Sequence, residues 1–330
     1  MLDSLMVSIP EYFASLKFTA LLRALPGGVA QGLIWGVLAL GVFLTFRMLG
    51  VSDLTVDGSM ATGGAVCIML VLAGVNPQLA LLASFLAGMA AGVITGFLHT
   101  KLGIPDILAG ILTQISLYSI NLNIMGKANQ AVNVNKVAFL FSSNAKLLTR
   151  TIWVVLGVCV ALVVALYLYL GTENGSALRA TGINGNMARA QGINTNRMKV
   201  IGLALSNGLV ALSGGIMSQY QGFADVKMGT GAIVIGLAAV IIGEVLGEAL
   251  VGRHMNFMVR LAFVVLGSVI YYVVYVFVLW LKFPPDDMKL LTAVVVAIFL
   301  AVPNLRAAKR NSFSRIAKQN AKAAKTTGEG

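Results

Sequence analysis

Long apolar runs separated by short polar segments constrain the fold of this chain more than any other feature of its sequence. Several runs reach about 20 residues, the length that an α-helix needs to cross the hydrocarbon core of a bilayer. The 330 residues are 58% hydrophobic and 11% charged, whereas soluble proteins carry roughly 25% charged residues. No polar segment approaches the length of about 50 residues that a separate domain requires. We therefore predict an all-α, polytopic membrane protein.

The apolar runs divide the chain into spans and connections. They predict transmembrane helices at residues 27–46, 51–73, 77–99, 104–125, 153–170, 199–220, 232–246, 257–281 and 290–302. Residues 1–26 lack the basic start and cleavage site of a signal peptide, and Lys17 and Arg23 interrupt their apolar run, which favours an interfacial amphipathic helix. We expect about nine spans, or ten if that segment also crosses. The domains would then be the interfacial helix 1–26, a transmembrane domain 27–303 and a basic tail 304–330, which would either lie near anionic headgroups or be disordered.

A basic loop at residues 172–199 joins the fifth and sixth predicted spans. It contains three arginines and one lysine against a single acid, Glu173. Short loops rich in Lys and Arg stay on the cytoplasmic side, so we place it there. Gly-Ile-Asn occurs twice, at 182–184 and 192–194. Because Gly and Asn tolerate the left-handed backbone that ends helices, we expect one or two short helices joined by these turns.

The second predicted span begins irregularly, with the sequence VSDLTVDGSMATGGA from residue 51. Its polar positions are Asp53, Thr55, Asp57 and Ser59. Lipid cannot satisfy the amides of a non-helical backbone, so this segment should face the protein interior. Two interpretations of the acids remain open: Asp53 either caps the following helix or lies on a transport route, and for Asp57 we favour the route.

Other polar residues interrupt later spans. Gln114 and Asn121 are seven residues apart and so share one helical face, which either lines a route or bonds to neighbouring helices. Asn207 lies on another small, polar helix face. Glu244 and Glu248 are four residues apart, and an ion pair of Glu244 with Arg253 or Arg260 is expected.

The remaining candidates for chemistry have structural explanations. The glycines of 88–96 repeat at spacings typical of packed membrane helices. Cys67 and Cys159 lie in apolar runs and should be small core residues, while His99 and His254 fall near the ends of spans. The sequence has neither a Gly-rich phosphate-binding loop nor a cluster with metal-ligand spacing. We expect no cofactor and no enzymatic activity, and the positive charges are better explained by membrane topology than by nucleic acid.

Three stretches, in the same order, resemble the permease subunits of ABC importers of the branched-chain amino acid and ribose families. The first is Asp-Leu-Thr-Val-Asp at 53–57, similar to the Asp-Leu-Ser-Val-Gly motif of ribose-type permeases but with Thr55 in place of Ser and Asp57 in place of Gly. The second is IPDILAGILTQISLYSINL from Ile104, and the third is ALRATGINGNMARAQGIN, followed by a helix containing LSNGLVALSGGI. The resemblance covers roughly residues 25–303.

This resemblance implies that residues 172–199 form a coupling loop that docks on a cytoplasmic ATPase. The coupling residues would be Arg179, Ala180, Gly182, Ile183, Asn184, Ala188, Arg189, Gly192, Ile193 and Asn194. The route for substrate would be lined by Asp53, Thr55, Asp57, Ser59, Gln114, Asn121 and Asn207. It also implies two ATP-binding subunits, a second permease copy or close paralogue, and an extracytoplasmic substrate-binding protein. The alternative for the loop is a basic connector that only fixes topology.

We interpret the chain as an importer subunit of the bacterial inner membrane that moves a small solute by alternating access. An amino acid is favoured over a sugar or nucleoside. An ion-coupled secondary transporter remains the alternative, since intramembrane acids and a broken helix suit that class as well.

Overall fold

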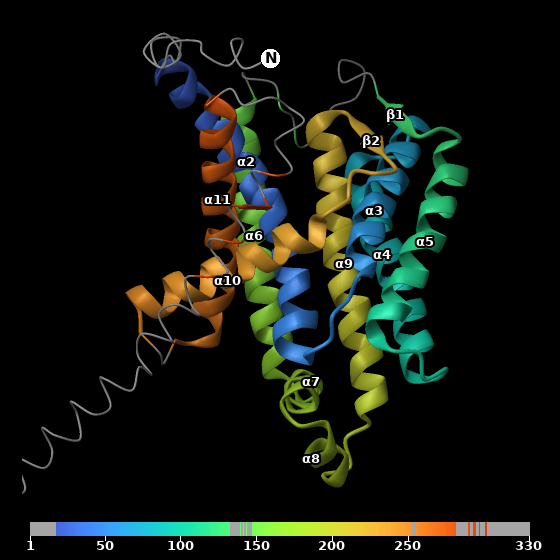
Figure 1. Ribbon diagram of the computed structural model, residues 1–330. Coiled ribbons are helices and arrows are strands. Elements are labelled where there is room, and N and C mark those ends of the chain that lie inside the picture. Colours follow the sequence, from blue (N-terminus) through green and yellow to red (C-terminus); the bar gives the residue numbers. More distant parts are fainter. Residues whose placement is uncertain are drawn as a thin grey trace, which may run out of the picture. The chain divides into compact units, whose positions relative to one another are not determined.

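The computed structural model describes residues 18–281, apart from 133–138, 140, 142, 144–146 and 253–254, together with residues 290, 293, 294, 297 and 301. Residues 1–283 form one unit and residues 284–330 a second. The helices below belong to the first unit (Figure 1). The predicted span 290–302 and the tail 304–330 lie almost entirely outside the described residues.

Within the described residues, eight helices are long and apolar enough to cross a membrane, which confirms the all-α, polytopic fold. They are α2 (Phe18–Val42) continued by the π-helix η1 (Phe43–Leu49), α3 (Thr55–Leu72), α4 (Pro77–Thr100), α5 (Asp106–Met125), α6 (Leu148–Gly171), α9 (Thr195–Gln221), α10 (Ala232–Leu250) and α11 (Phe257–Trp280). Two short helices, α7 (Glu173–Ile183) and α8 (Gly185–Ala190), occupy the loop between α6 and α9.

The first helix differs from its predicted bounds at both ends. It begins by Phe18 and passes through Pro26 without a break, so residues 18–26 form its first turns instead of a separate interfacial helix. Residues 1–17 lie outside the described part of the chain. At its other end the helix widens into η1, which stops at Gly50 with φ of +66°.

Two three-residue strands, β1 (Asn129–Ala131) and β2 (Phe223–Asp225), pair antiparallel. They join the α5–α6 connection to the α9–α10 connection at the end of the bundle opposite α7 and α8 (Figure 1).

Small residues bring α9 into close contact with α3 and α4 at the centre of the bundle. A Cβ atom added at Gly88 or Gly92 of α4 would collide with backbone carbonyls of α9, and one at Gly63 of α3 would collide with the carbonyl oxygen of Ala211. Such contacts let helix backbones approach closely, where dispersion contacts and weak hydrogen bonds stabilise membrane helices. The packing role predicted for the glycines of α4 is thus confirmed.

We expect Gly63→Ala to lower the free energy of unfolding by about 1–3 kcal/mol, because a backbone carbonyl cannot move aside as a side chain can. The matched control is Gly157→Ala on α6, where an added Cβ meets nothing within 4 Å. That change should leave stability equal or raise it by up to about 1 kcal/mol, since Ala favours helix over Gly. Thermal unfolding of both variants in detergent provides the measurement, and equal midpoints would contradict the packing argument.

Candidate functional site

A break between η1 and α3 holds several of the predicted site residues, and its backbone N–H groups find acceptors in η1, in the break itself and on α5. The N–H of Thr55 donates to Asp53 Oδ1 at 2.9 Å, and the N–H of Ser52 donates to Asp106 Oδ2 at 3.3 Å. The N–H of Val51 donates to the carbonyl of Thr45 at 3.0 Å. Asp53 thus caps the start of α3, as one of its two interpretations expected, while its place on a transport route stays a prediction. Asp106 was missed by the sequence analysis, although an acid in the first turn of a helix that follows Pro105 was a signal for it.

Asn207 of α9 joins the break to α3. Its Nδ2 donates to Asp53 Oδ2 at 2.6 Å, and its Oδ1 accepts from Ser59 Oγ at 2.6 Å. Asp53 is 2% exposed, and the other two side chains are fully buried. These three predicted route residues thus lie together, and their side chains are hydrogen-bonded to one another.

Thr55 begins a second polar chain that crosses three helices. Its Oγ1 lies 2.8 Å from Thr95 Oγ1 on α4, which donates to Thr113 Oγ1 on α5 at 3.0 Å. All three hydroxyls are buried. A hydroxyl chain of this kind fixes the start of α3 against its two neighbours, because leaving any one hydroxyl unpaired in an apolar environment is costly.

Asp57 caps a helix from a distance in sequence. Its Oδ2 accepts from the N–H of Gly231 at 2.9 Å and its Oδ1 from the N–H of Ile233 at 3.0 Å, both at the start of α10. A carboxylate is favourable at a helix N-terminus, where backbone N–H groups and the helix dipole present positive charge. The acid that departs from the ribose-type motif therefore has a structural task in this chain.

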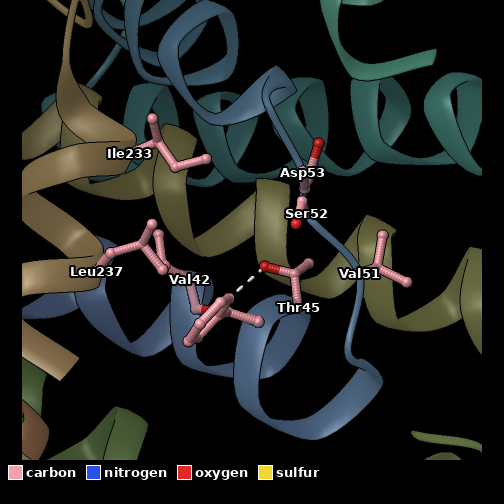
Figure 2. Close-up of a pocket in the computed structure, with 8 residues that line it drawn as sticks. Val42, Thr45, Val51, Ser52, Asp53, Ile233 and Leu237 are labelled. Atoms are coloured by element: carbon pink, nitrogen blue, oxygen red, sulfur yellow. Dashed lines mark hydrogen bonds between the residues drawn. The ribbon is translucent and has the colours of Figure 1, made fainter. Parts of the chain in front are cut away.

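A small cavity lies between the break and α10. It measures about 50 Å³ and is lined by Val42, Thr45, Phe46, Val51, Ser52, Asp53, Ile233 and Leu237. Figure 2 shows Asp53 and Thr45 on one side of this space and Ile233 and Leu237 on the other. Its volume is only slightly larger than the share of about 30 Å³ that one water has in the liquid, so it is too small for an amino acid.

The two remaining route residues lie apart from this cluster on α5. Gln114 is half-buried beside Gly58 of α3. Asn121 is fully buried, and neither of its amide atoms has a hydrogen-bond partner within the described residues.

The predicted short helices of the basic loop are present as α7 and α8, and each Gly-Ile-Asn unit ends in a capping residue. Asn184 Oδ1 accepts from the N–H groups of Asn186 and Met187, both at 3.1 Å. Asn194 Oδ1 accepts from the N–H of Arg197 at 3.0 Å, and Asn194 is thereby the N-cap of α9. Gly192 has φ of +80°.

Exposure divides the predicted coupling residues into two sets. The exposed members are Ile183, Asn184, Arg189, Gly192 and Asn194, and the buried or half-buried members are Arg179, Ala180, Gly182, Ala188 and Ile193. Ile183 is 86% exposed, and Met187, which the sequence analysis missed, is 63% exposed. The signal for Met187 was a large apolar residue within an otherwise polar loop.

The buried face of α7 packs on the end of η1. A Cβ at Gly182 would collide with the carbonyl oxygen of Met48. One residue earlier in η1, Arg47 Nε donates to Glu244 Oε1 of α10 at 2.8 Å, with Arg47 half exposed. Among the described residues, Glu244 therefore pairs with Arg47, 197 positions away in sequence, and the alternative partner Arg260 was wrong. The other expected partner, Arg253, lies outside the described residues.

We expect Asn207→Leu to destabilise the protein by about 2–3 kcal/mol, because it removes a hydrogen bond to the buried Asp53 carboxylate and leaves Ser59 without an acceptor. Asn123→Leu, at an exposed position of α5, is the matched control and should change stability by less than about 0.5 kcal/mol. Thermal unfolding in detergent compares the two. A midpoint for Asn207→Leu as high as that of the control would show that the network contributes nothing.

Comparison with known proteins places this geometry in a family. Residues 25–302 match the model described as branched-chain amino acid transport system / permease component. The chain is 37% identical over 288 residues to the tyrosine transport system permease protein of Clostridioides difficile (strain R20291), covering 87% of this chain and 94% of that protein. An uncharacterised protein of Rickettsia prowazekii (strain Madrid E) is 32% identical over 183 residues, covering 55% of this chain and 62% of its own length.

A solved structure, PsaBC from Streptococcus pneumoniae in complex with Fab, shares the fold. Its TM-score is 0.51 at 14% sequence identity, and the match covers 92% of this chain and 100% of that chain. The resemblance inferred from the break, the Ile-Pro helix and the basic loop is thereby confirmed: the protein belongs to the permease component family of branched-chain amino acid transport systems.

Proposed function

We propose that this permease imports an aromatic amino acid such as tyrosine, driven by two cytoplasmic ATP-binding subunits that dock on α7 and α8. The observation that carries the docking part is the exposed apolar pair Ile183 and Met187 on an otherwise polar loop. Apolar side chains exposed on a rigid element are typical of an interface with another protein. ATP hydrolysis belongs to the partner subunits, because the sequence has no phosphate-binding loop.

The contacts of α7 supply a route by which docking acts on the transmembrane helices. Gly182 lies against the backbone of Met48, so α7 and the end of η1 move together. Arg47 of η1 is paired with Glu244, and Asp57 of α3 holds the first N–H groups of the same helix, α10. A displacement of α7 is then transmitted to α10 and to the break, where the two states of alternating access would differ.

The complete system would contain a second permease copy or a close paralogue, with the route for substrate at their interface, and an extracytoplasmic binding protein that delivers substrate. In this arrangement Asp57 and Gln114 are the two predicted route residues that are partly exposed. The closed network of Asp53, Ser59 and Asn207 supports the break beside the route. We assign the assembly to the bacterial inner membrane.

The alternative of an ion-coupled secondary transporter needs an intramembrane acid that is free to exchange an ion or a proton. Asp53 and Asp57 each accept two hydrogen bonds through both carboxylate oxygens. These bonds give both acids structural tasks, which favours the ATP-driven class. The likeness to a tyrosine permease likewise favours an amino acid over a sugar or nucleoside.

Docking is tested by Met187→Asp and Ile183→Asp, which place a charge in the centre of the proposed interface. Each should lower the amount of ATPase subunit that copurifies with the permease at least tenfold, since desolvating an unpaired carboxylate costs several kcal/mol. Asn174→Asp, at an exposed position near the start of α7, adds the same charge away from the tip and should copurify normally. Full ATPase recovery and full transport with both tip variants would refute docking at this surface.

Substrate class is tested by uptake of labelled tyrosine into vesicles that contain the permease with the ATPase and binding protein from the same system. We expect ATP-dependent uptake that excess unlabelled phenylalanine reduces and ribose leaves unchanged. Uptake driven by an ion gradient without the ATPase would identify the secondary-transporter class. Inhibition by ribose but by no amino acid would identify a sugar importer.

A further inference from the structure

A groove opens where α6 ends, α7 starts and α11 starts. It has a volume of about 520 Å³, and its walls include Tyr167, Leu168, Leu170, Arg179, Asn256 and Phe257. The proposed docking surface at Ile183 and Met187 does not contribute to it. A ligand of this groove would therefore be separate from a partner docked at Ile183 and Met187.

The groove contains a guanidinium group with unused hydrogen-bonding capacity. Arg179 Nε is buried and has no hydrogen-bond partner within the described residues, while its Nη2 donates to Ser176 Oγ at 3.2 Å. A buried donor without an acceptor is costly, so an acceptor that enters the groove gains free energy. The planar fork of arginine matches the oxygens of a phosphate group particularly well.

The start of α11 adds positive potential to the same wall. Its N-cap residue, Asn256, lines the groove and makes no side-chain capping hydrogen bond. The first N–H groups of a helix carry partial positive charge and lack partners within the helix. Together with Arg179, they favour an anionic ligand over a neutral or cationic one.

An exposed apolar track leads from the groove along the membrane-spanning part of α6. Val160, Val164 and Leu168 are 54%, 36% and 64% exposed, and their spacing of four residues puts them on one side of the helix. The track is about 12 Å long at 1.5 Å per residue. A soluble partner cannot follow it into the hydrocarbon region, whereas a lipid presents a phosphate and an acyl chain at this separation.

We propose that this groove binds an anionic phospholipid of the leaflet that faces α7, with Arg179 on the phosphate and an acyl chain along Val160, Val164 and Leu168. The bound lipid bridges α7 and α11, so it contributes to the position of the loop relative to the bundle. This assignment requires that α6 and α11 cross the membrane. It does not depend on the substrate, and it gives Arg179, one of the predicted coupling residues, a lipid phosphate as its partner.

Native mass spectrometry of the purified permease, with phosphatidylglycerol or phosphatidylcholine added, tests the assignment. We expect the permease to retain phosphatidylglycerol about tenfold more than phosphatidylcholine, and Arg179→Gln to reduce that retention about tenfold, as loss of one charge-assisted hydrogen bond would. Arg197→Gln, an exposed arginine at the start of α9, is the matched control and should bind as the unmodified protein does.

Two further variants keep the test decisive if Arg179→Gln does not fold. Arg179→Lys retains the charge and should give intermediate retention. Leu168→Gln leaves Arg179 intact but interrupts the apolar track, and it should weaken phosphatidylglycerol binding several-fold. Equal retention by the unmodified protein, Arg179→Gln and Leu168→Gln would overturn the proposal.

Two other results would reassign the groove. Displacement of phosphatidylglycerol by millimolar inorganic phosphate, with no dependence on Leu168, would indicate a site for a free anion. Displacement of the lipid on addition of the ATPase subunit would indicate a protein interface. Neither result bears on transport, so this proposal fails separately from the importer function.

Discussion

The bilayer contains no water to satisfy the freed backbone of an interrupted helix, so the break between η1 and α3 depends on hydrogen bonds from within the protein. Asp53, Asp106 and the carbonyl of Thr45 accept the N–H groups of this segment. Asn207 then holds the Asp53 carboxylate and the Ser59 hydroxyl at once. The central position of α9 follows from this, because its polar face and its small residues must both meet α3.

The same constraint explains why α10 can begin at the break. A buried helix N-terminus needs acceptors, and Gly231 supplies none through a side chain. Asp57 of α3 provides them by binding the N–H groups of Gly231 and Ile233. Hydrogen bonds to Asp57 therefore connect the first turn of α3 to the start of α10. The Arg47–Glu244 ion pair connects η1 to α10 at a second point. Since Arg47 is half exposed, that pair contributes more to position than to stability.

Several parts of the site could be predicted from local sequence. The Asn residues of both Gly-Ile-Asn units cap the helix that follows, as residue type and spacing indicate. The capping alternative for Asp53 rests on a neighbour two residues away. By contrast, nothing local to Glu244 points to Arg47, and nothing local to Asp57 points to α10. The exposure of individual side chains in the loop could not be predicted from local sequence either. Ala188 is 3% exposed, while its neighbour Met187 is 63% exposed.

The sequence by itself determined the all-α membrane fold, the approximate positions of the spans within the described residues, the irregular start of the second span and the short helices of the basic loop. These properties depend on bilayer thickness, on hydrophobicity and on capping within a few residues, all of which are local. Only the tertiary structure decided which polar groups pair across helices, which face of α7 is buried and where a groove forms between α6 and α11. Such pairings depend on how small residues let distant helices approach, and that geometry is a property of the packed bundle as a whole.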